Sequence, residues 1–299
     1  MNDRQKCLIC NNSGKKIYSL PIKSHKLISF FLNYYKNKKL VKIFLSKIKN
    51  YTYVLLKCYE CKFIWQKYSL KNKLQNELYE KLISPKKSLE KSKKNLKIFK
   101  KRFNSEFNLF KEINYKKDFK ILDYGAGWGN WILSLNYDSK NIFALENSKK
   151  RIKYLKIKKI NVISFNYLKK KKPKFDFIRL EQVLEHIEDF DYIFQNFKKI
   201  LKKDGFVYIS VPNSKILFSK NWINNLLIKG PAQPLEHLNS FTPISLNKLL
   251  KKYDYKKISP IFLFKAFIMN KKFSFEYIKI VMRIIFNNYY NTSILFKIK

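Results

Sequence analysis

Hydrophobic and polar positions follow two different patterns along the chain, and the change falls near residue 120. Between residues 24 and 49 the apolar side chains recur every three or four positions, as on one face of a helix; they are Leu27, Phe30, Phe31, Tyr34 and Tyr35. Residues 70–115 are rich in lysine, keep the helical spacing and have little turn chemistry apart from Ser84-Pro85. Helices are therefore predicted in both ranges.

After Lys120, short apolar runs alternate with amphipathic segments. The apolar runs predict strands at Ile121–Asp123, Asn141–Glu146, Asn161–Asn166, Phe175–Leu180 and Phe206–Val211. The segments between them predict helices near Asn130–Leu135, Lys149–Lys159 and Asp189–Lys203, and a further helix is expected after Thr242-Pro243. This alternation predicts an α/β fold with a mainly parallel sheet that has helices on both faces.

The C-terminal tail and the length of the chain complete the expected architecture. In the tail we expect a strand at Ile258–Phe264, a helix at Phe275–Phe286 and a last strand at Ser293–Ile298. A chain of 299 residues can hold one large α/β domain and a smaller module. We divide it into an N-terminal module (1–69), a helical connector (70–115) and the α/β domain (116–299).

The formal net charge is +43, which is typical of proteins that bind nucleic acid or anionic membranes. The basic residues are almost all lysine, however, and only five are arginine: Arg4, Arg102, Arg151, Arg179 and Arg283. Arginine is the preferred residue for bidentate contacts with phosphates and bases. We therefore favour compositional drift toward lysine, asparagine and isoleucine as the source of the charge, with nucleic-acid binding as the alternative.

The sequence also bears on localisation. Residues 1–10 lack the apolar region of a signal peptide, and no stretch reaches the ~18 uninterrupted apolar residues of a membrane span. We expect a cytoplasmic protein. The phenylalanine- and lysine-rich tail, Phe273 to Phe286, offers an alternative in which the protein rests on an anionic membrane surface, peripheral to the inner membrane.

All four cysteines fall into two C-x-x-C pairs, Cys7/Cys10 and Cys58/Cys61. Two such pairs predict one four-cysteine zinc site, with the helices between the pairs as an insertion. Because protein thiolates would fill all four positions, this zinc would be structural. Two separate redox dithiols, or unpaired structural cysteines, are the alternatives; structural disulfides are disfavoured in the cytosol.

Three of the six glycines, Gly125, Gly127 and Gly129, lie in one predicted turn between a strand and a helix. Glycine allows unusual backbone angles and lets a ligand approach the main chain, and the turn also presents a helix N-terminus. The G-x-G-x-G spacing has Asn130 where a dinucleotide fingerprint has its last glycine. This departure favours S-adenosylmethionine (SAM) over a dinucleotide.

Two acidic residues agree with SAM as the ligand. Asp123 precedes the first glycine, where it would oppose a pyrophosphate but suits the cationic end of SAM. Glu146 closes the second predicted strand, and a carboxylate there can accept both ribose hydroxyls. The alternative is a structural turn followed by a surface glutamate.

Four segments, in order, resemble the class I SAM-dependent methyltransferase family: Ile121–Gly129, Phe175–Ile187, Leu201–Asn213 and Glu236–Leu246. The resemblance implies a doubly wound, Rossmann-like, mostly parallel sheet of seven strands. It also implies that Asp123 and the three glycines line the methionine part of SAM, and that Glu146 holds the ribose. Asn166 stands where the family usually has an aspartate facing the adenine. Glu181 and Gln182 would lie near the reacting methyl group.

Catalytic residues are harder to identify. His237, in the loop after the fifth predicted strand, is a candidate base, and organising that loop is its alternative role. Glu181 is the second candidate. His186 is expected to belong to the scaffold, and Trp222 to stack on a ring of the acceptor or to lie in the core.

An N-terminal zinc knuckle ahead of such a domain also resembles bacterial sugar and surface-polysaccharide methyltransferases. The leading hypothesis is therefore methyl transfer to a small molecule or glycan. RNA methylation is an alternative, although Leu180–Val183 replaces the Asn/Asp-Pro-Pro-Tyr-type motif of base amino methylation. The second alternative is a zinc-bearing binding protein that has no catalytic activity.

Overall fold

In the computed structural model the chain forms two compact units. The structure describes the whole chain except residues 36, 115–117, 219–229, 260–262, 264–267, 269–274, 287–290 and 299. The first unit comprises Met1–Ser88, Leu184–Glu188 and Pro212–Lys252, and the second comprises Leu89–Val183, Asp189–Val211 and Tyr253–Lys299. Each unit combines distant parts of the sequence.

The second unit is built on a seven-stranded sheet, in which the spatial order is β12-β13-β10-β9-β6-β7-β8. The strands are β6 (Ile121–Tyr124), β7 (Ile142–Leu145), β8 (Asn161–Ile163), β9 (Phe175–Glu181), β10 (Leu201–Pro212), β12 (Tyr255–Lys257) and β13 (Asn291–Ile298). Neighbours from β8 to β10 are parallel, whereas β12 and β13 are antiparallel. The expected α/β fold with a mostly parallel seven-stranded sheet is confirmed.

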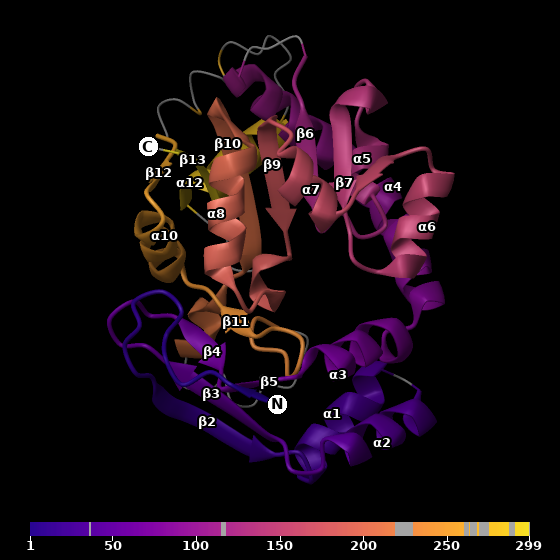
Figure 1. The fold of residues 1–299 in the computed structure, drawn as a ribbon, viewed down its shortest axis with the longest axis vertical. Helices are drawn as coiled ribbons and strands as arrows, with labels where there is room; N and C mark the ends of the chain where they lie inside the picture. The colour runs from indigo at the N-terminus through magenta and orange to yellow at the C-terminus, as the bar shows by residue number, and fades with distance from the viewer. Residues whose placement is uncertain are drawn as a thin grey trace. The chain divides into compact units, whose positions relative to one another are not determined.

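Helices cover both faces of this sheet. They are α4 (Pro85–Asn114), α5 (Asn130–Ser134), α6 (Lys149–Ile157), α7 (Phe165–Lys171), α8 (Phe190–Ile200) and α12 (Phe275–Phe286). On one face α8 lies in front of β9 and β10 in Figure 1, and its Phe197 ring packs 5.6 Å from that of Tyr124 in β6. On the other face Phe110 of α4 packs 4.8 Å from Phe177, within a core that α5 and α12 also join. The sheet is therefore doubly wound.

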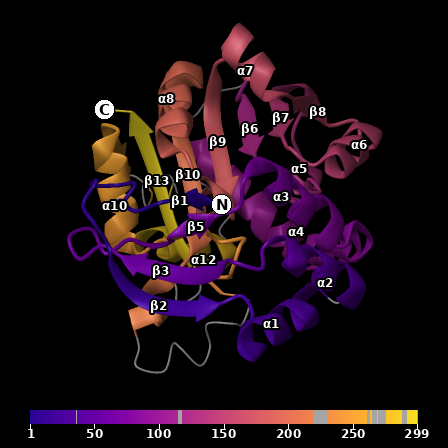
Figure 2. The same ribbon diagram turned by 60° about the horizontal axis from the view of Figure 1, so that its bottom comes forward.

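The first unit has a smaller antiparallel sheet in the order β11-β4-β3-β2. Its strands are β2 (Lys15–Pro21), β3 (Thr52–Lys57), β4 (Ile64–Gln66) and β11 (Asn239–Ser240), and β1 (Asn2–Asp3) pairs separately with β5 (Tyr68–Ser69). Figure 2 shows β2 and β3 side by side, with α1 (His25–Tyr35) and α2 (Lys38–Lys47) inserted between them in sequence. These helices bury Leu27, Phe31 and Phe44 against Tyr53 in one core. The helices expected between the cysteine pairs are confirmed.

The remaining helices agree with the sequence pattern. In the 70–115 range the structure has α3 (Asn72–Glu77), a π-helical turn (Leu78–Leu82) and α4, and Pro85 begins α4 directly after Ser84. Helix α10 (Pro243–Lys252) starts after Thr242, whose Oγ1 accepts from Ser245 N at 3.1 Å, as expected of an N-cap. Among the described helices, none has both the length and the apolar character needed to cross a bilayer.

Three predicted elements are corrected. Strand β8 ends at Ile163, because the Ser164 side chain caps α7 by accepting from Tyr167 N at 3.1 Å. Strand β10 begins at Leu201, where the pattern predicted the end of a helix. Residues 255–257 form β12, whereas Ile258 and Ser259 are outside any strand and most of the expected strand 258–264 lies outside the described residues.

Gly129 is required by packing as well as by its backbone angle. Its φ is +74°, and a Cβ there would lie 2.6 Å from Leu155 Cδ2 and 3.0 Å from Ile160 Cδ1. We expect Gly129→Ala to lower the free energy of unfolding by about 1–3 kcal/mol in urea denaturation. Gly127→Ala is the matched control, because its φ is also positive (+59°) but the new Cβ would meet no described atom within 4 Å. Equal losses in the two variants would contradict this explanation.

Candidate functional site

The glycine turn is fastened to the neighbouring strand. Gly125 N and Ala126 N both donate to the carbonyl oxygen of Leu145, the last residue of β7, at 2.8 and 3.0 Å. All three glycines have positive φ, which residues with side chains rarely adopt. The turn therefore holds a fixed shape at the carboxyl edge of the parallel strands, where ligands bind in sheets of this kind.

Glu146 lies against this turn, as expected. Its Oε2 accepts from Gly127 N at 2.8 Å, and its Oε1 accepts from Asn147 N and Ser148 N, each at 2.9 Å. In addition, Arg151 Nη1 lies 3.7 Å from Glu146 Oε2. The structure thus brings together two predicted binding residues, Gly127 and Glu146, and fixes the carboxylate through backbone donors.

Gly127 faces open space. A Cβ at this position would meet no described heavy atom within 4 Å, in contrast to Gly125 and Gly129, where it would clash with Val183 and Leu155. Packing of the protein therefore does not explain this glycine. Its positive φ favours glycine, and the open space leaves room for a ligand to approach the main chain.

Asp123 belongs to a buried ionic network under the turn. Its side chain is only 2% exposed, and Oδ1 accepts from Arg179 Nη1 at 3.3 Å. Burial raises the pKa of Asp123, and the charge of Arg179 opposes that rise. Arg179 Nε also donates to Glu106 Oε1 of α4 at 3.0 Å. The expected contact of Asp123 with SAM stays a prediction.

Glu181 joins the same network through both oxygens. Oε1 accepts from Arg102 Nη2 at 3.0 Å, and Oε2 accepts from Arg179 Nη2. The sequence analysis did not assign Arg102, Arg179 or Glu106 to the site. The available indication was Arg179 itself, because one of only five arginines in the chain lies in the middle of a predicted strand.

Two further predicted residues lie in different surroundings. Gln182 directly follows β9 with φ +57°, and its backbone N donates to Ser210 O of β10 at 2.8 Å. Positive φ in a residue other than glycine is often found at functional sites. Asn166, expected at a strand end, is instead an exposed residue of the first turn of α7.

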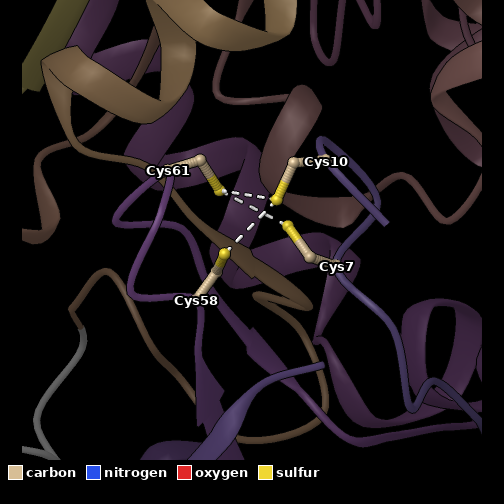
Figure 3. Close-up of side chains that lie close together, drawn as sticks. All are labelled: Cys7, Cys10, Cys58 and Cys61. Carbon is tan, nitrogen blue, oxygen red and sulfur yellow. Dashed lines mark hydrogen bonds between the residues drawn. The ribbon is translucent and has the colours of Figure 1, made fainter. Parts of the chain in front are cut away.

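The four cysteines converge in the first unit (Figure 3). Cys7 Sγ lies 3.4 Å from Cys61 Sγ, and Cys10 Sγ lies 3.4 Å from Cys58 Sγ and 3.8 Å from Cys61 Sγ. These contacts join one C-x-x-C pair to the other, which favours one common site over two separate dithiols. A tetrahedral zinc with Zn–S bonds of about 2.3 Å needs sulfurs about 3.8 Å apart. Hydrogen bonding by the Cys61 thiol lowers the pKa of Cys7 to about 5, so one thiolate forms readily.

His237 and His186 lie close together in the first unit. Their ring centroids are 4.9 Å apart. His237 Nδ1 bonds the carbonyl oxygen of Gly230 at 2.7 Å, and His186 Nδ1 bonds that of Glu236 at 2.8 Å. The geometry is compatible with either expected role of His237. Trp222 lies outside the described residues.

Glu185 lies beside the two histidines and is completely buried. Among the described residues, neither of its carboxylate oxygens has a hydrogen-bond partner. Burial raises the pKa of this carboxyl to about 8. An unpaired buried carboxylate costs on the order of several kcal/mol, so without a counter-charge this group is mostly protonated near neutral pH, and it ionises there only beside a cation.

Comparisons with known proteins agree with the fold. A chain from Pelagibacter ubique named "Ubiquinone biosynthesis O-methyltransferase" is 27% identical over 128 residues, which are 40% of this chain and 53% of that enzyme. The plantazolicin methyltransferase BpumL, solved in complex with SAH, is 15% identical with a TM-score of 0.50 over 75% of this chain and 94% of that chain. The related BamL structure gives 13% identity and the same TM-score and coverage. At these identities the two structures show a shared fold.

The family itself is defined by sequence. The family model described as "Methyltransferase domain" matches residues 75–259, from α3 through β12. This range contains the glycine turn, Glu146, the arginine network and both histidines. The match covers more than half of the sequence, and the chain therefore belongs to the methyltransferase-domain family.

Proposed function

We propose that this protein transfers a methyl group from SAM to a small-molecule or glycan acceptor. The observation that supports this most directly is Gly127, whose missing side chain leaves open space beside a fixed glutamate. Membership of the methyltransferase-domain family agrees with it. The alternative, a non-catalytic protein that had lost the ability to bind SAM, would have no need to keep this glycine turn.

Each predicted residue has a proposed role toward SAM. Asp123 and the three glycines line the methionine part, and Asn166 approaches the adenine. Glu146 faces the ribose; an ionised carboxylate has about four acceptor positions and backbone donors use three of them, so one position stays open for a ribose hydroxyl. SAM supplies the methyl group on a sulfonium, and the protein's main task is to align it with the acceptor.

Acceptor activation is assigned to His237, with Glu181 as the second candidate and Gln182 as a neighbour of the methyl group. His237 Nδ1 is engaged with a carbonyl, which fixes the ring orientation. Glu181 is less suited to take a proton, because both oxygens already accept from arginines.

The acceptor class is proposed from two sources. The cluster of four cysteines resembles that of sugar and surface-polysaccharide methyltransferases, which favours a glycan or nucleotide-sugar. The Pelagibacter relative is named for ubiquinone biosynthesis, which favours a phenolic hydroxyl as the second candidate. A screen of both acceptor classes with methyl-labelled SAM separates them.

RNA is the less favoured acceptor. The lysines of α6, such as Lys149, Lys153 and Lys156, are exposed and form a coat on the solvent side of the helix, opposite the buried Leu155. Such a coat gives weak, salt-sensitive attraction and no sequence selectivity.

We also propose a cytoplasmic location, with α12 as a peripheral contact to anionic lipid, since its Phe275 and Phe286 are 70% and 65% exposed.

SAM binding through the turn can be tested with Gly127→Val. The new side chain would fill the space proposed for methionine, so we expect the affinity for SAM in calorimetry to fall at least about tenfold, or about 1.4 kcal/mol. Lys172→Val is the matched control, because it places the same β-branched residue at another positive φ (+43°) outside the turn. Unchanged affinity in Gly127→Val would show that the site is misplaced.

The four-cysteine cluster is proposed to hold one structural zinc ion. Titration of the four thiols with a mercurial should release one equivalent of zinc, and Cys58→Ser should abolish that release and destabilise the first unit. Tyr59→Ser, at an exposed neighbouring position, should leave zinc and stability unchanged. Four thiols that react freely in the untreated protein, without release of zinc, would overturn the proposal.

A further inference from the structure

Glu185, His186 and His237 form a cluster that the proposed function does not explain. One ligand atom from each of the three lies within 4.8 Å of the other two. Glu185 and His186 are neighbours in a 3-10 turn (Leu184–His186), whereas His237 comes from the segment before β11. Two separate parts of the first unit thus bring these side chains together.

The carboxylate of Glu185 lacks the partners that burial normally demands. The residue is 0% exposed, and neither oxygen has a hydrogen-bond partner among the described residues. Buried carboxylates in proteins are usually paired with a cation or several donors. A positive charge inside the cluster would satisfy both oxygens.

The hydrogen bonds of the two imidazoles indicate which ring nitrogen carries the proton. His186 Nδ1 contacts Glu236 O at 2.8 Å and the Tyr79 hydroxyl at 3.1 Å, and His237 Nδ1 contacts Gly230 O at 2.7 Å. Because a carbonyl oxygen can only accept, we assign the proton of each ring to Nδ1. The lone pair of each ring is then on Nε2. Histidines that bind metals typically donate their other ring N–H to a carbonyl or carboxylate in this way.

We propose that Glu185, His186 and His237 bind a divalent transition metal ion, zinc in the first place, at a mononuclear site separate from the four-cysteine cluster. Two imidazoles and one carboxylate are a ligand set that such ions accept, with bonds of about 2.0–2.2 Å. Bonds of this length need ligand atoms about 3.3–3.6 Å apart, so the three atoms, which lie within 4.8 Å of one another, would move closer by up to about 1.5 Å when the ion binds.

Three protein ligands leave coordination positions open, unlike the four thiolates of the cysteine cluster. A hydroxyl or water oxygen can occupy an open position, and the ion lowers its pKa. This consequence rests on the proposed methyltransferase function. Under this proposal His237 is not the base that takes the proton of the acceptor. It is a ligand of the metal ion, and the ion lowers the pKa of the acceptor hydroxyl.

Cobalt(II) substitution of the full-length protein tests the site. Metal-free protein is titrated with Co2+, and we expect two equivalents, of which one shows thiolate-to-cobalt charge-transfer absorption and the other shows only weaker ligand-field bands. Glu185→Gln and His237→Gln should each lower the affinity for the second equivalent at least about 100-fold and leave the thiolate band intact. His25→Gln, an exposed histidine of α1, is the matched control and should keep both equivalents.

Two outcomes would refute the proposal. One is a wild-type protein that binds a single equivalent with the thiolate band. The other is a second equivalent that persists in both Glu185→Gln and His237→Gln, each verified as folded by circular dichroism. SAM affinity, measured by calorimetry on the same samples, reports on the proposed function separately, so that either idea can fail while the other stands.

Discussion

The ion network around Arg179 is the constraint on which the cofactor side of the second unit depends. One guanidinium in the middle of β9 contacts Glu106 of α4, Asp123 of β6 and Glu181 at the end of its own strand. All of these groups are buried or partly buried, so removing Arg179 would leave Glu106 and Asp123 in the interior without their counter-charge. The network therefore links α4 to β9 and to β6, the strand that leads into the glycine turn.

A comparable polar centre organises the first unit. Gln66 of β4 donates to the carbonyl oxygens of Gln233 and His237, both at 2.8 Å, and Leu235 N donates to Gln66 Oε1. Arg4 reaches the same segment by donating to Leu238 O at 3.0 Å, and burial lowers its pKa to about 10. One amide side chain thus defines the position of the loop that contains His237.

Sequence patterns predicted the elements that are determined by residues close together in the chain. The glycine turn and α10 were predicted because backbone angles and caps depend on adjacent residues, and the sheet because alternation of strands and helices restricts topology. The Arg179 network was missed, since pairing of Arg179 with Glu106 depends on how α4 packs. The predicted end of β8 was too late along the chain. The Ser164 side chain caps α7, so the strand ends before the apolar pattern does. The convergence of Glu185 with His237 depends on contacts 52 residues apart, such as that between Asn239 and Ile187.

The pairing of β11 with β4 has a consequence for how the protein is made. Asn239 lies opposite Trp65, and Arg4 donates to the side chain of Asn239 across 235 residues. During synthesis the small sheet therefore stays without its last strand until most of the chain has left the ribosome. Contacts between such distant segments slow folding, and an unpaired strand edge is prone to aggregation meanwhile. The N-terminal cysteine module, although made first, can be completed only after the segment that holds His237 has emerged.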